Sequence, residues 1–213
     1  MKPLYGGIDL HANNSVLVVL DDEDQVVYRK RFPNDLEHIL IQLAPYRTQL
    51  QGLVVESTFN WYWLVDGLME AGYHVHLANT AAIQQYTGLK YTDDDTDARW
   101  LAHLLRLGVL PTGYIYPKEV RAVRDLLRKR SQLVHQKTAN LLSIQPLLTR
   151  NTGQVFSGNQ IKQLLPETIG ELVALPEHVV ALQATLAVMR HLAEQITLIE
   201  RAVEKIKRGQ IFG

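Results

Sequence analysis

The stretch YGGIDLHANNSVLVVL, residues 5–20, holds two apolar runs on either side of a short polar segment. Leu4–Leu10 and Ser15–Leu20 have the length and composition of strands, and a third such run, Val26–Phe32, follows the polar turn DDEDQ. Short strands joined by tight turns pair antiparallel. The pattern therefore predicts a three-stranded meander at the start of the chain.

The next segment alternates between helical and extended patterns. Asn34 is suited to cap a helix, because apolar residues recur at helical spacing directly after it. Gly52–Glu56 has the pattern of a short buried strand, residues 60–71 that of a helix ended by Gly72, and residues 73–77 that of another strand. Helices that alternate with strands in this way predict an α/β fold with a mixed sheet flanked by helices.

The second half of the chain has helical patterns. Residues 117–148 contain one strong helix breaker, Pro146, where we expect a kink. The segment RNTGQVFSGNQ, residues 150–160, has the composition of a linker. We therefore expect one domain over residues 1–150, followed by a linker and a helical arm over residues 151–213.

The arm carries the pattern of a coiled coil. From Pro176 to Lys207 apolar residues recur at steps of three and four, which is close to a heptad repeat. Such a seam needs a partner helix, either from this chain or from a second copy. We expect a homo-oligomer that forms through this coiled coil.

Composition limits the class of protein. The 22 basic residues balance the 22 acidic ones, so any preference for nucleic acid must come from local clusters of charge. The chain has no cysteine, which excludes disulfides and thiolate metal sites and fits a cytoplasmic protein. It has no signal-peptide pattern and no apolar run long enough for a membrane span, so we expect no contact with a membrane.

The most unusual local feature is a cluster of four aspartates, Asp93, Asp94, Asp95 and Asp97, at the start of a helical pattern. Acidic residues at a helix start are favoured by the helix dipole, by about 0.3–1 kcal/mol each. The density of charge exceeds what capping needs, however, and we expect the neighbouring Arg99 to pair with the cluster. Asp94 and Asp97 lie three apart and share a helix face.

Two further carboxylates stand at strand ends. Asp9 lies near the end of an apolar strand, and Glu56 ends the run GLVVE. Each alone could begin a turn or face solvent. Together with the Asp-x-x-Asp helix they could gather four carboxylates at one sheet edge, a hard oxygen set that suits Mg²⁺. A pair of such ions could clamp a displacement at phosphorus.

These motifs resemble the DEDD transposases of bacterial insertion sequences, relatives of the Piv-type invertases. The similarity lies in GIDLHANN with Asp9, VVEST with Glu56, and DDTDARWLAHLL with Asp94 and Asp97. It implies an RNase H-like (RuvC-like) domain in which these four residues are the catalytic metal ligands for Mg²⁺, with Mn²⁺ able to replace it. It further implies metal-dependent cleavage and strand transfer on DNA.

The resemblance also implies a nucleic-acid contact. Residues 118–137 carry seven basic side chains against two acidic ones, and a one-sided charge of this kind suits phosphate binding better than a solvated helix face. Members of the family resemble recombinases guided by a structured bridge RNA, so RNA is an expected partner beside DNA. The candidate contacts are Arg121, Arg124, Arg128, Lys129, Arg130 and Lys137.

The sequence departs from the family's pattern at its end. Family members carry a further C-terminal domain with a serine nucleophile, and no serine here stands in a matching context. We expect this chain to lack that domain.

Two other classes of protein remain open from the sequence. An actin-like or sugar-kinase fold also begins with a strand that carries G-x-D, although HANN here replaces the Gly and Thr that approach ATP phosphate in that fold. A non-catalytic assembly module built on the heptad helix is the other. Stabilisation by ATP would indicate the first class, and dimerisation without any response to divalent metal would indicate the second.

Overall fold

The computed structural model describes residues 2–83 and 94–209, and the side chains of residues 94–96 lie outside that description. Contacts divide the chain into two compact units, Met1–Ile115 and Tyr116–Gly213. We had expected the boundary after residue 150. It falls earlier because the long helix before that point packs against the C-terminal helix.

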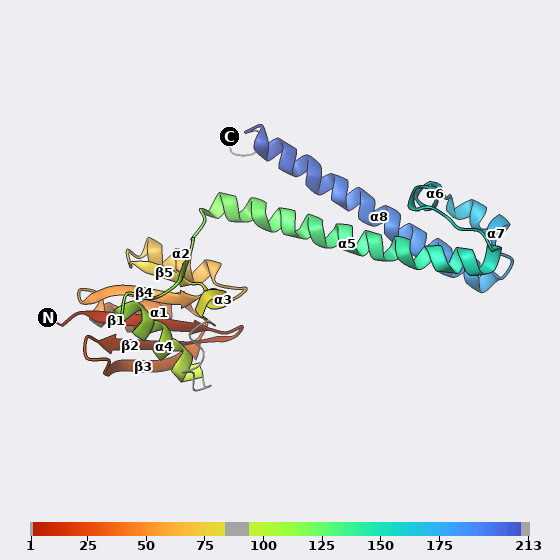
Figure 1. Ribbon diagram of the computed structural model, residues 1–213. Helices are drawn as coiled ribbons and strands as arrows, with labels where there is room; N and C mark the ends of the chain where they lie inside the picture. The colour runs from red at the N-terminus through yellow and green to blue at the C-terminus, as the bar shows by residue number, and fades with distance from the viewer. Residues whose placement is uncertain (1, 84–93, 210–213) are drawn as a thin grey trace. The chain divides into compact units, whose positions relative to one another are not determined.

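The N-terminal unit is built on a six-stranded mixed sheet (Figure 1). The strand order is β3-β2-β1-β4-β5-β6, with β1, β4 and β5 parallel and the remaining neighbours antiparallel. The strands are β1 (Leu4–Leu10), β2 (Asn14–Asp21), β3 (Val26–Pro33), β4 (Leu50–Glu56), β5 (Val75–Ala78) and β6 (Thr112–Gly113).

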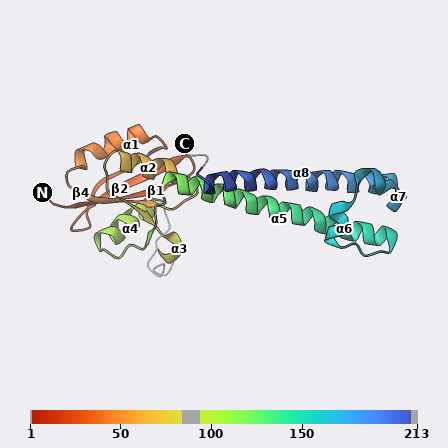
Figure 2. The same cartoon turned by 90° about the horizontal axis from the view of Figure 1, so that it is seen from above.

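Helices cover both faces of this sheet (Figure 2). On one face α1 and α2 bury the larger apolar core, which includes Ile8 and Leu17 from the strands. On the other face α4 packs on β1, β2 and β4. The helices are α1 (Leu36–Leu43), α2 (Tyr62–Glu70), α3 (Thr80–Ile83) and α4 (Asp94–Arg106), with a 3-10 turn at Ala44–Tyr46.

This strand order and layering confirm the expected α/β class and the RNase H-like fold. The three-stranded meander is present with nearly the expected bounds. The predicted cap at Asn34 is wrong: Asp35 caps α1 and accepts from the His38 amide. Asn34 instead donates to the carbonyl oxygens of His11 and Ala12, across the sheet edge.

Gly7 allows α4 to lie unusually close to the central strand. A Cβ atom on Gly7 would overlap the carbonyl oxygen of Ala98 and would lie 2.8 Å from the backbone nitrogen of Ala102. Both alanines are fully buried against valines of β2, so small side chains on the helix complete the contact. The helix cannot move away without losing these contacts, because protein interiors are close-packed.

The C-terminal unit is a pair of long helices with short elements at their connection. Figure 1 shows α8 running back along α5. The helices are α5 (Lys118–Thr152), α6 (Gly158–Gln163), α7 (Ile169–Leu172) and α8 (Pro176–Lys207), with a 3-10 turn at Pro166–Thr168. The expected linker is shorter than residues 150–160, because α5 continues through Pro146 to Thr152 and Ser157 opens α6 with a capping box.

The partner of the heptad seam is α5 of the same chain. Seam residues Leu182, Leu186 and Met189 of α8 form a core with Ile144 and Leu148 of α5. Further along the pair, Arg130 Nε donates to Glu200 Oε1 at 2.8 Å. The seam therefore needs no second copy for its burial. None of the helices described for residues 2–83 and 94–209 is long and apolar enough to cross a bilayer.

We predict that Gly7→Ala destabilises the N-terminal unit by about 1–3 kcal/mol, because overpacking forces the helix and the strand apart. The matched control is Gly113→Ala in β6, where the nearest atom would lie at an ordinary 3.7 Å. Urea unfolding of both variants measures the difference. Equal stability of the two variants would contradict the close approach.

Candidate metal centre

Asp9 is a buried carboxylate near the end of β1. Only 2% of its surface is exposed, although it is an acidic residue. It lies on the same face of the strand as Gly7, since residues two apart point the same way, and this is the face covered by α4. His11 Nε2 lies 3.1 Å from Asp9 Oδ2. A charge removed from water in this way needs compensating partners.

Glu56 is placed next to Asp9 by the register of the parallel strands. Ile8 pairs with Val55, so the following residues, Asp9 and Glu56, continue the same row. Val54, two residues before Glu56, packs under α4, which puts Glu56 on that face as well. Neighbouring strands lie about 4.8 Å apart, so the two carboxylates start from adjacent backbone positions.

The start of α4 extends toward this row. A Cβ on Gly52 would meet Leu105 near the end of the helix, whereas one on Gly7, further along the sheet, would meet Ala98 and Ala102. The helix therefore runs opposite to the parallel strands. The two residues from Gly7 to Asp9 add about 6.6 Å of strand, which about four helical residues span at 1.5 Å each. Asp94, the first residue of the helix, lies four residues before Ala98. The helix start therefore reaches about as far along the sheet as Asp9.

The acidic residues of α4 occupy this start. Asp94 is the first residue of the helix, and its side chain lies outside the described part. Asp97 is partly buried and precedes Leu101 by one turn, and Leu101 packs against β4 and β5. Asp93 lies outside the described residues. Among the side chains described for residues 2–83 and 97–209, no three acidic or histidine residues are grouped closely enough to hold a metal ion.

Two asparagines hold the loop that follows Asp9. The carbonyl oxygen of His11 accepts from Asn34 Nδ2 at 2.9 Å and from Asn60 Nδ2 at 3.0 Å. Ser15 Oγ in turn donates to Asn34 Oδ1 at 2.6 Å. The loop is thereby tied both to β3 and to the segment after Glu56. Sequence reasoning missed this clasp, because its members are 23 and 49 residues from His11.

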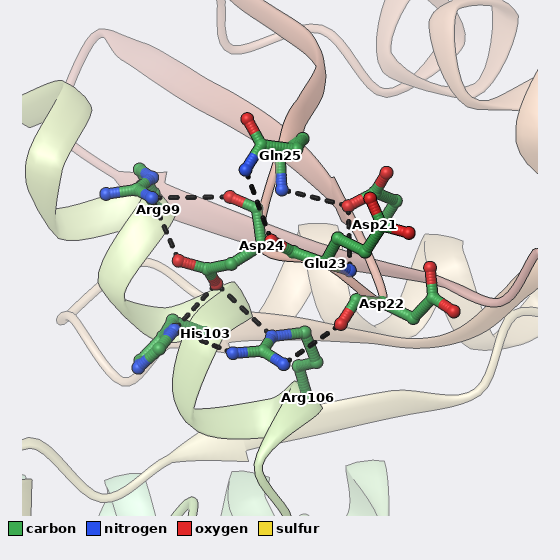
Figure 3. A network of polar contacts seen from close by, with 8 residues as sticks. All are labelled: Asp21, Asp22, Glu23, Asp24, Gln25, Arg99, His103 and Arg106. Carbon is green, nitrogen blue, oxygen red and sulfur yellow. Dashed lines mark hydrogen bonds and ion pairs between the residues drawn. The ribbon is translucent and has the colours of Figure 1, made fainter.

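A second clasp fixes the other end of α4 (Figure 3). Asp24, in the turn between β2 and β3, has a left-handed backbone with φ of 66°, which Asp tolerates better than most residues. Its carboxylate accepts from Arg99 Nη2 at 2.9 Å, from His103 Nδ1 at 2.6 Å and from Arg106 Nε at 3.2 Å. Arg99 was expected to pair with the aspartate cluster, and the structure pairs it with this turn.

The environment of Asp24 favours its charged form. Partial burial raises the pKa of the carboxyl, but the hydrogen bond and charge of His103, together with Arg99 and Arg106, outweigh burial and hold that pKa below its usual value. The ionised carboxylate thus stabilises the packing of α4 on the sheet. This stabilisation is present above the unfolded pKa of about 3.9 and is lost as the pH falls through the lower folded pKa.

The candidate nucleic-acid residues all lie on α5, in varied surroundings. Arg124, Arg128 and Lys129 are exposed, and Arg124 lies over the Tyr116 ring at 5.0 Å. Arg130 and Lys137 are partly exposed, and Arg130 is paired with Glu200. Arg121 is only 3% exposed. A surface contact with phosphate therefore suits the three exposed residues best.

An RNase H-like sheet with carboxylates at the ends of β1, β4 and the start of α4 is a fold and arrangement typical of nucleic-acid processing enzymes. The sequence profile of the DEDD transposases of the IS110 type matches residues 6–151, well over half of the chain. The chain belongs to this transposase family. The match favours it over the ATP-binding and assembly classes. No curated protein matches the chain significantly.

We predict that Asp24→Asn lowers the free energy of unfolding by about 1–2 kcal/mol at pH 7, because a charged acceptor is lost while Asn still tolerates the left-handed backbone. The loss shrinks as the pH falls below about 4, because the carboxyl is protonated first in the unfolded state and then, at its lower folded pKa, in the native state. Urea unfolding across this pH range measures it. Asp22→Asn, an exposed carboxylate of the same turn, is the control. A difference between wild type and Asp24→Asn that is unchanged by pH would contradict the role of the charge.

Proposed function

We propose that this transposase cuts and rejoins DNA phosphodiesters with the help of divalent metal, and that Asp9, Glu56, Asp94 and Asp97 are its ligands. The observation that carries the proposal is the buried Asp9 carboxylate, which stands in one row with Glu56 on the face that α4 covers. No core packing requires two acidic residues there. Two neighbouring carboxylates repel each other, and a cation shared between them offsets that repulsion.

The residues fit a hard divalent cation. All four candidate ligands are carboxylates, the donor type that Mg²⁺ prefers, and the chain offers no thiolate. Asp9 and Glu56 come from adjacent strands, which hold them rigidly. Positions 94 and 97 lie on the first turn of a helix that the Asp24 clasp fixes at its other end. Mg²⁺ is the expected ion, and Mn²⁺ accepts the same ligands.

The residues around the proposed site would have different roles in this chemistry. A divalent ion held by these four carboxylates would activate the attacking oxygen and stabilise charge on the leaving oxygen. Asp9 and Glu56 fix one side of the site, and the start of α4 supplies the other. His11 lies against Asp9 and holds that carboxylate in place, while Asn34 and Asn60 hold the His11 backbone. Preorganised ligands of this kind keep the reacting groups in productive geometry.

The exposed cations of α5 support a second part of the proposal, the binding of a structured guide RNA. Arg124, Arg128 and Lys129 lie within six residues on the exposed part of one helix. Cations spaced along a rigid helix suit the regular phosphates of an RNA stem, which proteins recognise largely by shape. DNA competes for the same charges, so the test must identify the nucleic acid.

We predict that wild-type protein binds Mn²⁺, and that Asp9→Asn, Glu56→Gln and Asp97→Asn each weaken that binding at least tenfold, because each removes a charged oxygen ligand. Isothermal titration measures the affinity. Glu37→Gln is the control, since Glu37 is an exposed carboxylate on α1, on the opposite face of the sheet.

Thermal unfolding of the same variants separates loss of a ligand from loss of the fold. Asp9→Asn keeps the size and shape of the side chain, so we expect it to remain folded, with a cooperative unfolding transition in the absence of metal. Wild-type Mn²⁺ affinity in the Asp9 and Asp97 variants would refute the proposed site.

We predict that the protein purified from its native cells carries a defined RNA, which sequencing of the copurified nucleic acid identifies. Arg128→Gln with Lys129→Gln should reduce its yield severalfold, because two phosphate contacts are lost. Arg150→Gln with Lys162→Gln removes one exposed cation from the C-terminal end of α5 and one from α6, and serves as the control. Random RNA fragments, or equal yields from both double variants, would contradict guide binding by this helix.

A further inference from the structure

A run of three basic residues, Arg29, Lys30 and Arg31, lies on β3, the edge strand of the sheet. All three are exposed. Charged residues on an edge strand often serve only to block pairing with another sheet, and for that purpose the face on which each one points is unimportant. The register gives these three residues different positions relative to the candidate metal centre.

Arg31 and Arg29 point to the face that carries Asp9. Phe32 and Tyr28 pack into the core under α1 and α2, so Arg31 and Arg29, at the alternate positions of the strand, face the other way. Arg31 pairs with Val16, and Val16 pairs with Asp9, so one row across the sheet joins Arg31 to the carboxylates. Lys30 shares the face of Phe32 and points away from them.

The distances suit a nucleic-acid strand that passes the site. Two strand spacings separate Arg31 from Asp9, about 9.6 Å between backbones, which is close to three nucleotides of rise along one DNA strand at about 3.4 Å each. Arg29 pairs with Val18, next to Gly7, and so lies one step further along the same face. The two arginines thus flank the carboxylate row on its β3 side.

Several other cations contact groups of the N-terminal unit, and Arg29 and Arg31 also make polar interactions within the chain. Lys2 pairs with Glu23, Arg99 and Arg106 hold Asp24, and Arg47 donates to the Ala71 carbonyl oxygen. A phosphate that approaches four carboxylates meets repulsion, and positive charge beside the site offsets it. A guanidinium has five N–H donors, so an arginine that contacts a carboxylate keeps donors for phosphate.

We propose that Arg29 and Arg31 bind backbone phosphates of the DNA strand that carries the scissile phosphate, a few nucleotides away from it on the β3 side of the metal centre. This inference rests on the proposed function, since it places the DNA substrate relative to the same carboxylates. Lys30 takes no part, because its side chain is on the opposite face.

The experiment measures binding of the full chain to a fluorescent DNA duplex by anisotropy, in Mg²⁺ and over a range of salt. Arg31→Gln and Arg29→Gln should each lower the slope of log affinity against log salt by about 0.9, which is about eightfold in affinity near 0.1 M salt. Lys30→Gln removes the same charge from the same strand and should keep the wild-type slope. Arg31→Lys should restore most of the slope.

Equal effects of Lys30→Gln and Arg31→Gln, or a wild-type slope in Arg31→Gln, would overturn the inference, as would a wild-type protein that binds no duplex. Mn²⁺ titration of the same samples reports separately on the proposed function. We expect Arg31→Gln to keep wild-type Mn²⁺ affinity. If the protein binds Mn²⁺ but Arg31→Gln and Lys30→Gln give the same salt slope for DNA binding, the proposed metal centre stands and the phosphate site on β3 is refuted.

Discussion

The close approach of α4 to β1 at Gly7 is the constraint on which the rest of the N-terminal unit depends. Because residue 7 has no side chain, the backbone of Ala98 can lie directly on the strand, and the alanines of the helix complete the contact with β2. The parallel register of β1 and β4 then sets where Asp9 and Glu56 stand relative to the start of that helix. A larger separation would leave these acidic residues far from the helix start.

Electrostatics divides α4 into two ends with different tasks. Toward its C-terminus, Arg99, His103 and Arg106 converge on Asp24 and fix the helix to the β2–β3 turn. Its N-terminus carries the aspartates, where the helix dipole offsets part of their repulsion. The clasp at Asp24 stabilises the fold by itself, whereas the proposed metal centre would make the stability of the acidic end depend on a cation. The clasp at Asp24 fixes α4 on the sheet, and this rigidity keeps the aspartates at the start of the helix in position.

Much of this architecture could be predicted from local patterns. The meander, the strand that ends at Glu56, and the bounds of α8 follow from apolar spacing and turn residues, and the acidic motifs led to the family. What could not be predicted depends on residues distant in sequence. Asp24 and Arg99 are 75 residues apart, and neither stands in a pattern that reveals the other. Asn34 has the chemistry of a cap, and only the neighbouring loop shows why it serves His11 while Asp35 caps α1. The boundary after Ile115 was missed because a long helix gives the same pattern whether it packs on a sheet or on another helix.

In the proposed metal centre, segments distant in the sequence bring their carboxylates to one cation. The most direct measurement is anomalous diffraction from crystals of the full chain grown with Mn²⁺. The account predicts a peak about 2.1 Å from carboxylate oxygens of Asp9 and Glu56, with an oxygen of Asp94 or Asp97 completing the set. An anomalous peak only at other residues, or no peak at these oxygens in crystals grown with saturating Mn²⁺, would contradict the proposed metal centre.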